Sequence, residues 1–205
     1  MIKKFLFIII VILALFTGLL FPSIYLFVEE KYTFLSSKIP EITNNLIWKV
    51  SFICHISFGG LSLVIGWIQF VEKLRKKNII LHRIIGKLYI LSVIISSLTA
   101  IYIGFFANGG FISASGFICL GVLWFTTTMI ALISIKNGNI KKHQNFMTYS
   151  YACTFAAVTL RLWIPLLNSL LRSPELAYLI VAWLCWIPNI IVAYFINKHR
   201  NTIKE

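Results

Sequence analysis

Six long apolar runs constrain this chain more than any other feature of its sequence. A helix that crosses a hydrocarbon core needs about 20 apolar residues, and each run is long enough. The runs are Phe5 to Val28, Leu46 to Phe70, Ile84 to Phe106, Gly116 to Ile135, Phe146 to Leu167 and Ala177 to Ile196. In water they would leave large exposed apolar patches, which excludes a soluble fold. We therefore predict an all-α polytopic membrane protein, a bundle of six transmembrane helices.

The segments between the runs are short apart from residues 29–45, so residues 1–205 are predicted to form a single transmembrane domain. The first run resembles a signal peptide, but its apolar stretch is too long and has no convincing small-residue cleavage site. We expect this helix, about residues 5–28, to stay in place as an uncleaved anchor.

The basic residues predict the orientation of the bundle. Cytoplasmic loops carry the excess of Lys and Arg in membrane proteins. With both termini in the cytoplasm, all but five of the 19 Lys and Arg residues fall on the cytoplasmic side. The five are Lys31, Lys38, Lys49 and Arg172 in outer segments and Arg161 within the fifth run. This topology accounts for the net charge of +13 without a nucleic-acid partner.

Polar and small residues recur every three or four positions in the second, third and fifth runs, which places them on one face of each helix. These three seams are Trp48, His55, Gly59, Ser62, Gly66 and Gln69; His82, Gly86, Tyr89, Ser96 and Ala100; and His143, Met147, Ser150, Thr154, Ala157 and Arg161. Small residues at this spacing let membrane helices pack closely, so packing alone accounts for most of them. Ionisable residues at membrane depth are costly and usually mark a site, so the histidines need a separate explanation.

The histidines differ in predicted depth. His82 and His143 lie at the cytoplasmic ends of their helices, where a solvated interfacial side chain is the alternative to a site. His55 lies about 14 Å inside the membrane, too deep for its ring to reach water. His199 belongs to the charged C-terminal tail and is expected to be solvated.

Arg161 has two possible positions. If the fifth helix continues to Leu171, Arg161 lies as deep as His55, and the two could share a second, outer pocket. If Pro165 ends the helix, Arg161 reaches the outer interface instead. The chain contains no Asp, and Glu72 falls at the opposite end of the second helix, so no carboxylate within the membrane is available to pair with Arg161.

The scarcity of acidic residues excludes several functions. Membrane zinc hydrolases need an acidic ligand or base, and ion-coupled carriers usually contain intramembrane acids. The run Ser113-Ala114-Ser115-Gly116 is interpreted as a helix start near the outer surface rather than as a serine-protease site. What remains for the histidines is ligation of a metal or a haem by neutral imidazole. Haem is favoured, because helix N-termini and nearby cations would repel a bare dication but attract haem propionates.

The pattern HRxxGxxY in His82-Arg83-Ile84-Ile85-Gly86-Lys87-Leu88-Tyr89 resembles a bacterial family of predicted membrane proteins, domain of unknown function 2306. The segments His143 to Met147 and Thr154 to Leu162 resemble its fifth-helix signature, and Trp183 to Asn189 its sixth. The likeness covers about residues 47–195 and implies a multi-pass protein of the bacterial cytoplasmic (inner) membrane. It transfers no function.

A weaker, architectural resemblance is to the ascorbate-reducible transmembrane cytochromes b, which hold haems between alternate helices. His82 and His143 are similar to one such ligand pair. The other pair is incomplete, because the fourth helix has Trp124 and Thr126 to Thr128 where a partner for His55 is needed. The resemblance therefore implies at most one bis-histidine haem.

The leading hypothesis is a b-type haem-binding or quinone-linked electron-transfer protein. His82 and His143 would ligate the haem iron, Gly86 and Tyr89 would contact the cofactor, and His55 with Arg161 would form a second pocket for a quinone. The alternative is a non-catalytic bundle that binds anionic lipid or a partner protein at its cytoplasmic rim. The rim residues would be His82, Arg83, Lys87, Lys142 and His143.

Overall fold

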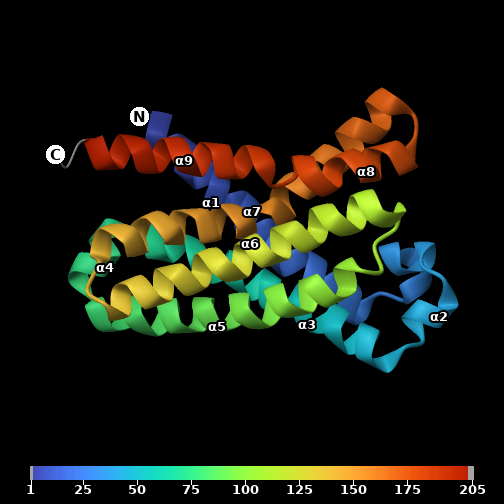
Figure 1. The fold of residues 1–205 in the computed structure, drawn as a ribbon, viewed down its shortest axis with the longest axis horizontal. Coiled ribbons are helices and arrows are strands. Elements are labelled where there is room, and N and C mark those ends of the chain that lie inside the picture. The colour runs from blue at the N-terminus through green and yellow to red at the C-terminus, as the bar shows by residue number, and fades with distance from the viewer. Residues whose placement is uncertain (1, 203–205) are drawn as a thin grey trace. The chain divides into compact units, whose positions relative to one another are not determined.

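A computed structural model describes residues 2–202, and every regular element within them is a helix (Figure 1). Six stretches are long and apolar enough to cross a membrane, which confirms the predicted fold class. They are Lys4–Phe27, Leu46–Phe70, Ile79–Gly104, Gly110–Lys136, Ile140–Leu171 and Pro174–Thr202. The third, fourth and fifth stretches begin five or six residues before their predicted starts. Backbone hydrogen bonding extends each helix through the residues that precede the predicted apolar run.

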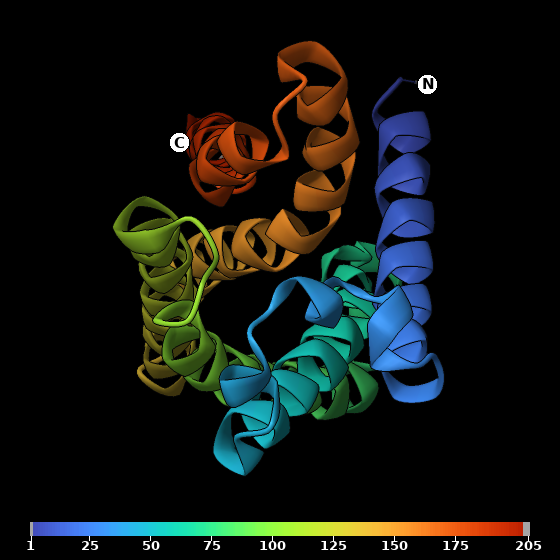
Figure 2. The same cartoon turned by 90° about the vertical axis from the view of Figure 1, so that its right-hand side faces the viewer.

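The chain divides into two compact units, the first ending at Thr99 and the second beginning at Ala100. The first unit contains the long helices α1 and α3 and most of α5. The bounds of its helices after the first loop are α3 (Leu46–Gly66), the short 3-10 helix η3 (Trp67–Phe70), α4 (Glu72–Lys77) and α5 (Ile79–Gly104). Helix α1 (Ile2–Phe27) packs along α3 (Figure 2). A Cβ atom on Gly60 of α3 would lie 2.6 Å from the carbonyl oxygen of Gly18, so glycine is required for this approach.

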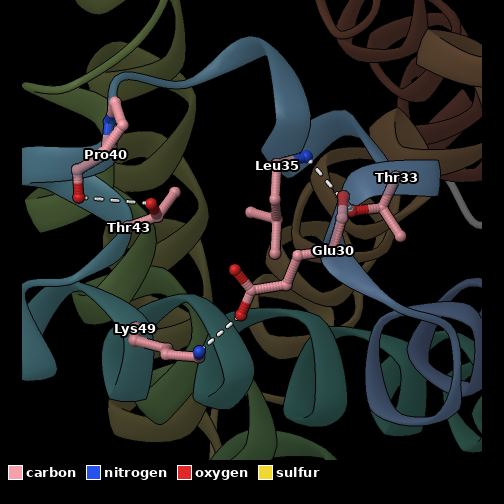
Figure 3. A network of polar contacts seen from close by, with 6 residues as sticks. All are labelled: Glu30, Thr33, Leu35, Pro40, Thr43 and Lys49. Atoms are coloured by element: carbon pink, nitrogen blue, oxygen red, sulfur yellow. Dashed lines mark hydrogen bonds and ion pairs between the residues drawn. The ribbon is translucent and has the colours of Figure 1, made fainter.

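The loop between α1 and α3 is built from short helical turns held by polar contacts (Figure 3). These turns are η1 (Glu30–Tyr32), η2 (Phe34–Ser37) and α2 (Pro40–Thr43). Thr33 caps η2 by accepting a hydrogen bond from the Leu35 amide at 3.2 Å. Glu30 forms an ion pair with Lys49 in the first turn of α3, which ties the loop to the helix that follows it.

The second unit consists of four helices joined by short connections. They are α6 (Gly110–Lys136), α7 (Ile140–Leu171), α8 (Pro174–Leu184) and α9 (Ile187–Thr202). Helices α6 and α7 run side by side, and two buried hydrogen bonds join them (Figure 1). Trp124 Nε1 donates to Thr154 Oγ1 at 2.9 Å, and the hydroxyls of Thr128 and Ser150 are 2.7 Å apart. Polar seam residues thus join neighbouring helices, as membrane bundles require.

Helix α7 continues through Pro165 to Leu171 and bends in its later part (Figure 2). Proline removes one backbone donor and bends a helix without always ending it. Arg161 therefore lies ten residues, or about 15 Å along the helix, from the end of α7. The helix continues past Pro165, as the deeper of the two positions requires, and the depth of Arg161 in the membrane stays a prediction.

Two sequence-based interpretations are wrong. Ser113 does not start a helix, because α6 begins at Gly110 and the Ser113 side chain is fully buried. The sixth span is also not one helix, since α8 ends at Leu184 and α9 begins at Ile187. Pro188 stands in the first turn of α9, where a missing N–H is tolerated, so the sequence contained a signal for this break.

Candidate functional site

His143 lies in the first turn of α7, in the second unit, with its ring turned toward α6. Its Nδ1 atom is 2.9 Å from the carbonyl oxygen of Ala131. A carbonyl oxygen only accepts, so Nδ1 carries a proton, and in the neutral imidazole Nε2 keeps its lone pair. The side chain is half-buried, and no hydrogen bond to Nε2 is found among the described residues. This arrangement leaves one ring nitrogen of His143 as a potential ligand atom.

Arg200 of α9 stands over the same end of α7. Its Nη2 atom donates to Asn145 Oδ1 at 2.6 Å and to Asn197 Oδ1 at 2.5 Å, and it lies 3.4 Å from Thr148 Oγ1. Asn197 in turn donates from Nδ2 to the Asn145 carbonyl at 3.0 Å. These contacts fix the position of the Arg200 guanidinium. It lies beside the first turns of α7, within a few residues of His143.

This polar cluster, which consists of Asn145, Thr148, Asn197 and Arg200, was not identified from the sequence. The recognisable signal was the spacing of Asn197 and Arg200, which at three residues share a face of α9. Lys141 and Lys142 add two exposed cations in the first turn of α7. The carboxylate described in this unit is Glu175, in the first turn of α8, so this end of the unit is strongly basic within the described residues.

His55 occupies a different environment in the first unit. Its Nδ1 atom is 3.0 Å from the Ser96 carbonyl oxygen of α5 and 3.1 Å from Ser96 Oγ. Ser96 Oγ donates in return to the His55 carbonyl at 2.8 Å. His55 therefore has the same protonated Nδ1 as His143, fixed by a backbone carbonyl of a neighbouring helix. This reciprocal pair is the internal partner that a histidine at this depth needs.

Gly86 lies on the seam of α5 between His82, one turn before it, and Tyr89, one turn after it. A Cβ atom on Gly86 would lie 3.3 Å from Oε1 of Gln69, so the side-chain amide of Gln69 fills the space that the glycine leaves. Tyr89 is fully buried and His82 is half-buried. The motif HRxxGxxY thus surrounds a contact between α5 and η3, and Gln69 joins His82, Gly86 and Tyr89 as a residue of this site.

Arg161 donates from Nη1 to the Ala157 carbonyl of its own helix at 2.7 Å. Because His55 and His82 belong to the first unit and His143 and Arg161 to the second, the pairings His82 with His143 and His55 with Arg161 stay predictions.

A third polar centre joins α7 to the break between α8 and α9. Thr159 Oγ1 donates to the Cys185 carbonyl at 2.5 Å. Asn189 Nδ2 lies 3.1 Å from both that carbonyl and Thr159 Oγ1, and 3.3 Å from the Ala152 carbonyl. A helix break inside a membrane exposes backbone carbonyls, and these side chains satisfy the Cys185 carbonyl.

No group of three or more His, Cys, Asp or Glu side chains that could hold a metal ion occurs among residues 2–202.

Six membrane-crossing stretches, with histidines and hydrogen-bonded polar residues on their inner seams, define a multi-pass integral membrane protein. The chain belongs to the family described as "Predicted membrane protein (DUF2306)", whose model matches residues 52–197. This confirms the resemblance seen in the sequence motifs, and the matched region begins within α3 and leaves α1 outside. Searches of curated proteins and of solved structures found no match.

Proposed function

We propose that this protein is a b-type haem-binding, electron-transfer component of the membrane, with His143 as an axial ligand of the haem iron. The observation that carries the proposal is the hydrogen bond from His143 Nδ1 to the Ala131 carbonyl. Metal-ligating histidines almost always donate their other ring N–H to a carbonyl or carboxylate, which fixes the tautomer and the orientation of the ring. His143 has this arrangement, with Nε2 as the ligand atom.

The charges around His143 fit the same group. Haem carries two propionates, which need cationic or hydrogen-bonding partners when they lie in a membrane. Lys141, Lys142 and Arg200 supply three cations at this end of the second unit, and Arg200 is held by three side-chain contacts.

When bound, haem would supply one-electron transfer at its iron. The chain's own residues have simpler tasks. The Ala131 carbonyl would keep the proton on Nδ1 of His143, and the cations near His143 would neutralise the haem propionates. The sequence predicts His82 as the second axial ligand. A separate variant, His82→Ala, tests this prediction.

The experiment is an absorption spectrum of the purified protein after haem-supplemented expression. We expect a Soret band and, on reduction, the α and β bands of a b-type haem. His143→Ala should remove them, whereas the matched change His199→Ala, at an exposed position of α9, should leave them intact. Loss of the bands in His82→Ala would identify the second ligand. A wild-type protein without a Soret band would overturn the proposal.

A second candidate function is binding of anionic phospholipid by the basic end of the second unit, without redox chemistry. It is favoured by Lys141, Lys142 and Arg200, since clusters of cations beside a membrane helix attract anionic headgroups. Native mass spectrometry distinguishes it. Lys141→Gln with Lys142→Gln should reduce retention of phosphatidylglycerol relative to phosphatidylcholine, whereas Lys31→Gln, in the loop between α1 and α3, should not.

We also propose that both termini lie in the cytoplasm of a bacterium, with the spans in its inner membrane. The excess of Lys and Arg in the predicted cytoplasmic loops supports this orientation. Fusions of alkaline phosphatase after residue 138 and after residue 173 test it. The first should be inactive and the second active, and the reverse result would show the opposite orientation.

A further inference from the structure

Gln69 is a buried polar side chain whose donor has no partner. It lies in η3, the 3-10 helix that ends the second span, and is 9% exposed. Its Nε2 atom is buried and makes no hydrogen bond to any described residue. Buried amide groups in proteins are nearly always hydrogen-bonded, so a donor in this state points to a partner outside the polypeptide.

The position of this amide is fixed by the neighbouring helix. A Cβ atom on Gly86 would lie 3.3 Å from Gln69 Oε1, closer than most side chains approach, so the glycine lets the amide lie against α5. Gly86 is seven residues from the start of α5, or about 10 Å along the helix. The donor is therefore buried against α5 near one end of the second span, and its burial separates it from bulk water.

We propose that the Gln69 amide donates a hydrogen bond to a carbonyl oxygen of a lipid-soluble quinone, bound at the face of α5 that carries His82 and Gly86. The ligand must enter from the bilayer, so most of its surface must be apolar. It must present an acceptor to an N–H group, which a quinone carbonyl does.

This inference deepens the proposed function, because it names the partner of the electron-transfer protein, and its redox meaning rests on that function. Binding of the quinone itself does not depend on that function. Phospholipid ester carbonyls offer the same acceptor chemistry, so the experiment must separate the two sources.

The test measures thermal unfolding of the full chain in nanodiscs of phosphatidylcholine, titrated with decylubiquinone. The quinone should raise the midpoint of the wild-type protein saturably, because a ligand that binds only the folded state stabilises it. Gln69→Met keeps the side-chain length and removes the donor. It should weaken quinone binding about tenfold, as expected for loss of one hydrogen bond. Gly86→Ala, which displaces the amide, should weaken binding in the same direction.

The unfolding midpoint measured without quinone distinguishes a ligand-binding role of Gln69 from a purely structural one. If the Nε2 donor has no protein partner, Gln69→Met should leave the unliganded midpoint unchanged or raise it. A lower unliganded midpoint, or unchanged quinone affinity, would overturn the assignment. The matched change Gln144→Met in α7 should preserve the quinone-induced shift.

Two further arms separate the sources and the hypotheses. An effect of Gln69→Met on stability that appears in ester-linked but not in ether-linked bilayers would assign the donor to a lipid ester and contradict the quinone site. His143→Ala should lose the haem bands yet keep the quinone-induced shift. If the wild-type protein shows the haem bands but does not bind quinone, this inference is disproved while the proposed function is not.

Discussion

His143 Nδ1 lies 2.9 Å from the carbonyl oxygen of Ala131, and this contact determines which nitrogen of the ring is protonated. We predict that His143 is the Nδ1–H tautomer in the protein without haem. Solid-state NMR of the ¹⁵N-labelled protein near pH 8 should show a protonated Nδ1 and an unprotonated Nε2. His143→Ala should remove both signals and identify them.

The same spectra should show a second histidine in this tautomer, because His55 Nδ1 faces the Ser96 carbonyl at 3.0 Å. Ser96→Ala keeps that carbonyl, so the tautomer of His55 should persist in this variant. A protonated Nε2 on His143 would contradict its proposed role as a ligand, since the lone pair would then lie on the nitrogen that faces Ala131.

Gly60 should tolerate no larger side chain. A Cβ atom there would lie 2.6 Å from the Gly18 carbonyl oxygen and 2.5 Å from Pro22 Cγ, so α1 and α3 would have to separate. We predict that Gly60→Ala destabilises the protein by about 1–3 kcal/mol, as overpacking usually does. The measurement is the unfolding free energy in detergent. Leu61→Ala changes an exposed neighbour on α3 and should cost less; equal effects would mean that α1 does not depend on this contact.

The seams were predictable because helical spacing alone places residues on a face. Trp48, Ser62, Tyr89, Ser150 and Thr154 are all buried, as the pattern requires. Partners across a seam were not predictable. Nothing in the sequence says that Trp124 meets Thr154, or that the amide of Gln69 lies against Gly86, because these contacts depend on helix rotation and on which helices are neighbours.

The broken sixth span shows a different limit. Apolar residues continue without interruption from Leu176 to Ile187, across the break itself, so the apolar run gives no sign of it. The sign lies in Pro188 together with Asn189, a polar side chain that can satisfy a carbonyl freed by the break. Cys185 supplies that carbonyl, and Thr159 from α7 supplies the second donor, which no local pattern reveals.

The polar centre of Thr159, Cys185 and Asn189 should contribute measurably to stability. We predict that Asn189→Leu costs about 1–2 kcal/mol, because the amide loses its contacts with the Cys185 and Ala152 carbonyls. A double-mutant cycle with Thr159→Val should give a coupling of about 0.6 kcal/mol and no more than about 1.7 kcal/mol, the average and the maximum found for hydrogen bonds between membrane helices.

Asn168→Leu is the matched control for Asn189→Leu, since Asn168 Oδ1 is buried without a hydrogen-bond partner among the described residues. Its replacement should be neutral or stabilising. If Asn168→Leu and Asn189→Leu destabilise equally, loss of amide volume rather than of hydrogen bonds explains both effects.

Lys38, in the loop between α1 and α3, should be the most reactive amine of that loop near pH 8. Burial of its side chain lowers its pKa to about 8, because desolvation disfavours the ammonium form. An unfolded lysine has a pKa of about 10.4. Between these values the unfolded state binds a proton that the folded state does not, so stability should rise with pH from about 8 to about 10.4. Below pH 8 both states are protonated, and the full cost of burying the charge applies.

Amine-reactive labelling followed by mass spectrometry measures this pKa directly. At pH 8 Lys38 should be modified faster, per exposed amine, than Lys31, whose side chain is 62% exposed and paired with Glu29. Lys38→Met should abolish the rise of the unfolding midpoint above pH 8, whereas Lys31→Met should preserve it. Equal labelling rates of the two lysines across pH 7 to 10 would show that the Lys38 ammonium is solvated and that the loop does not close over it.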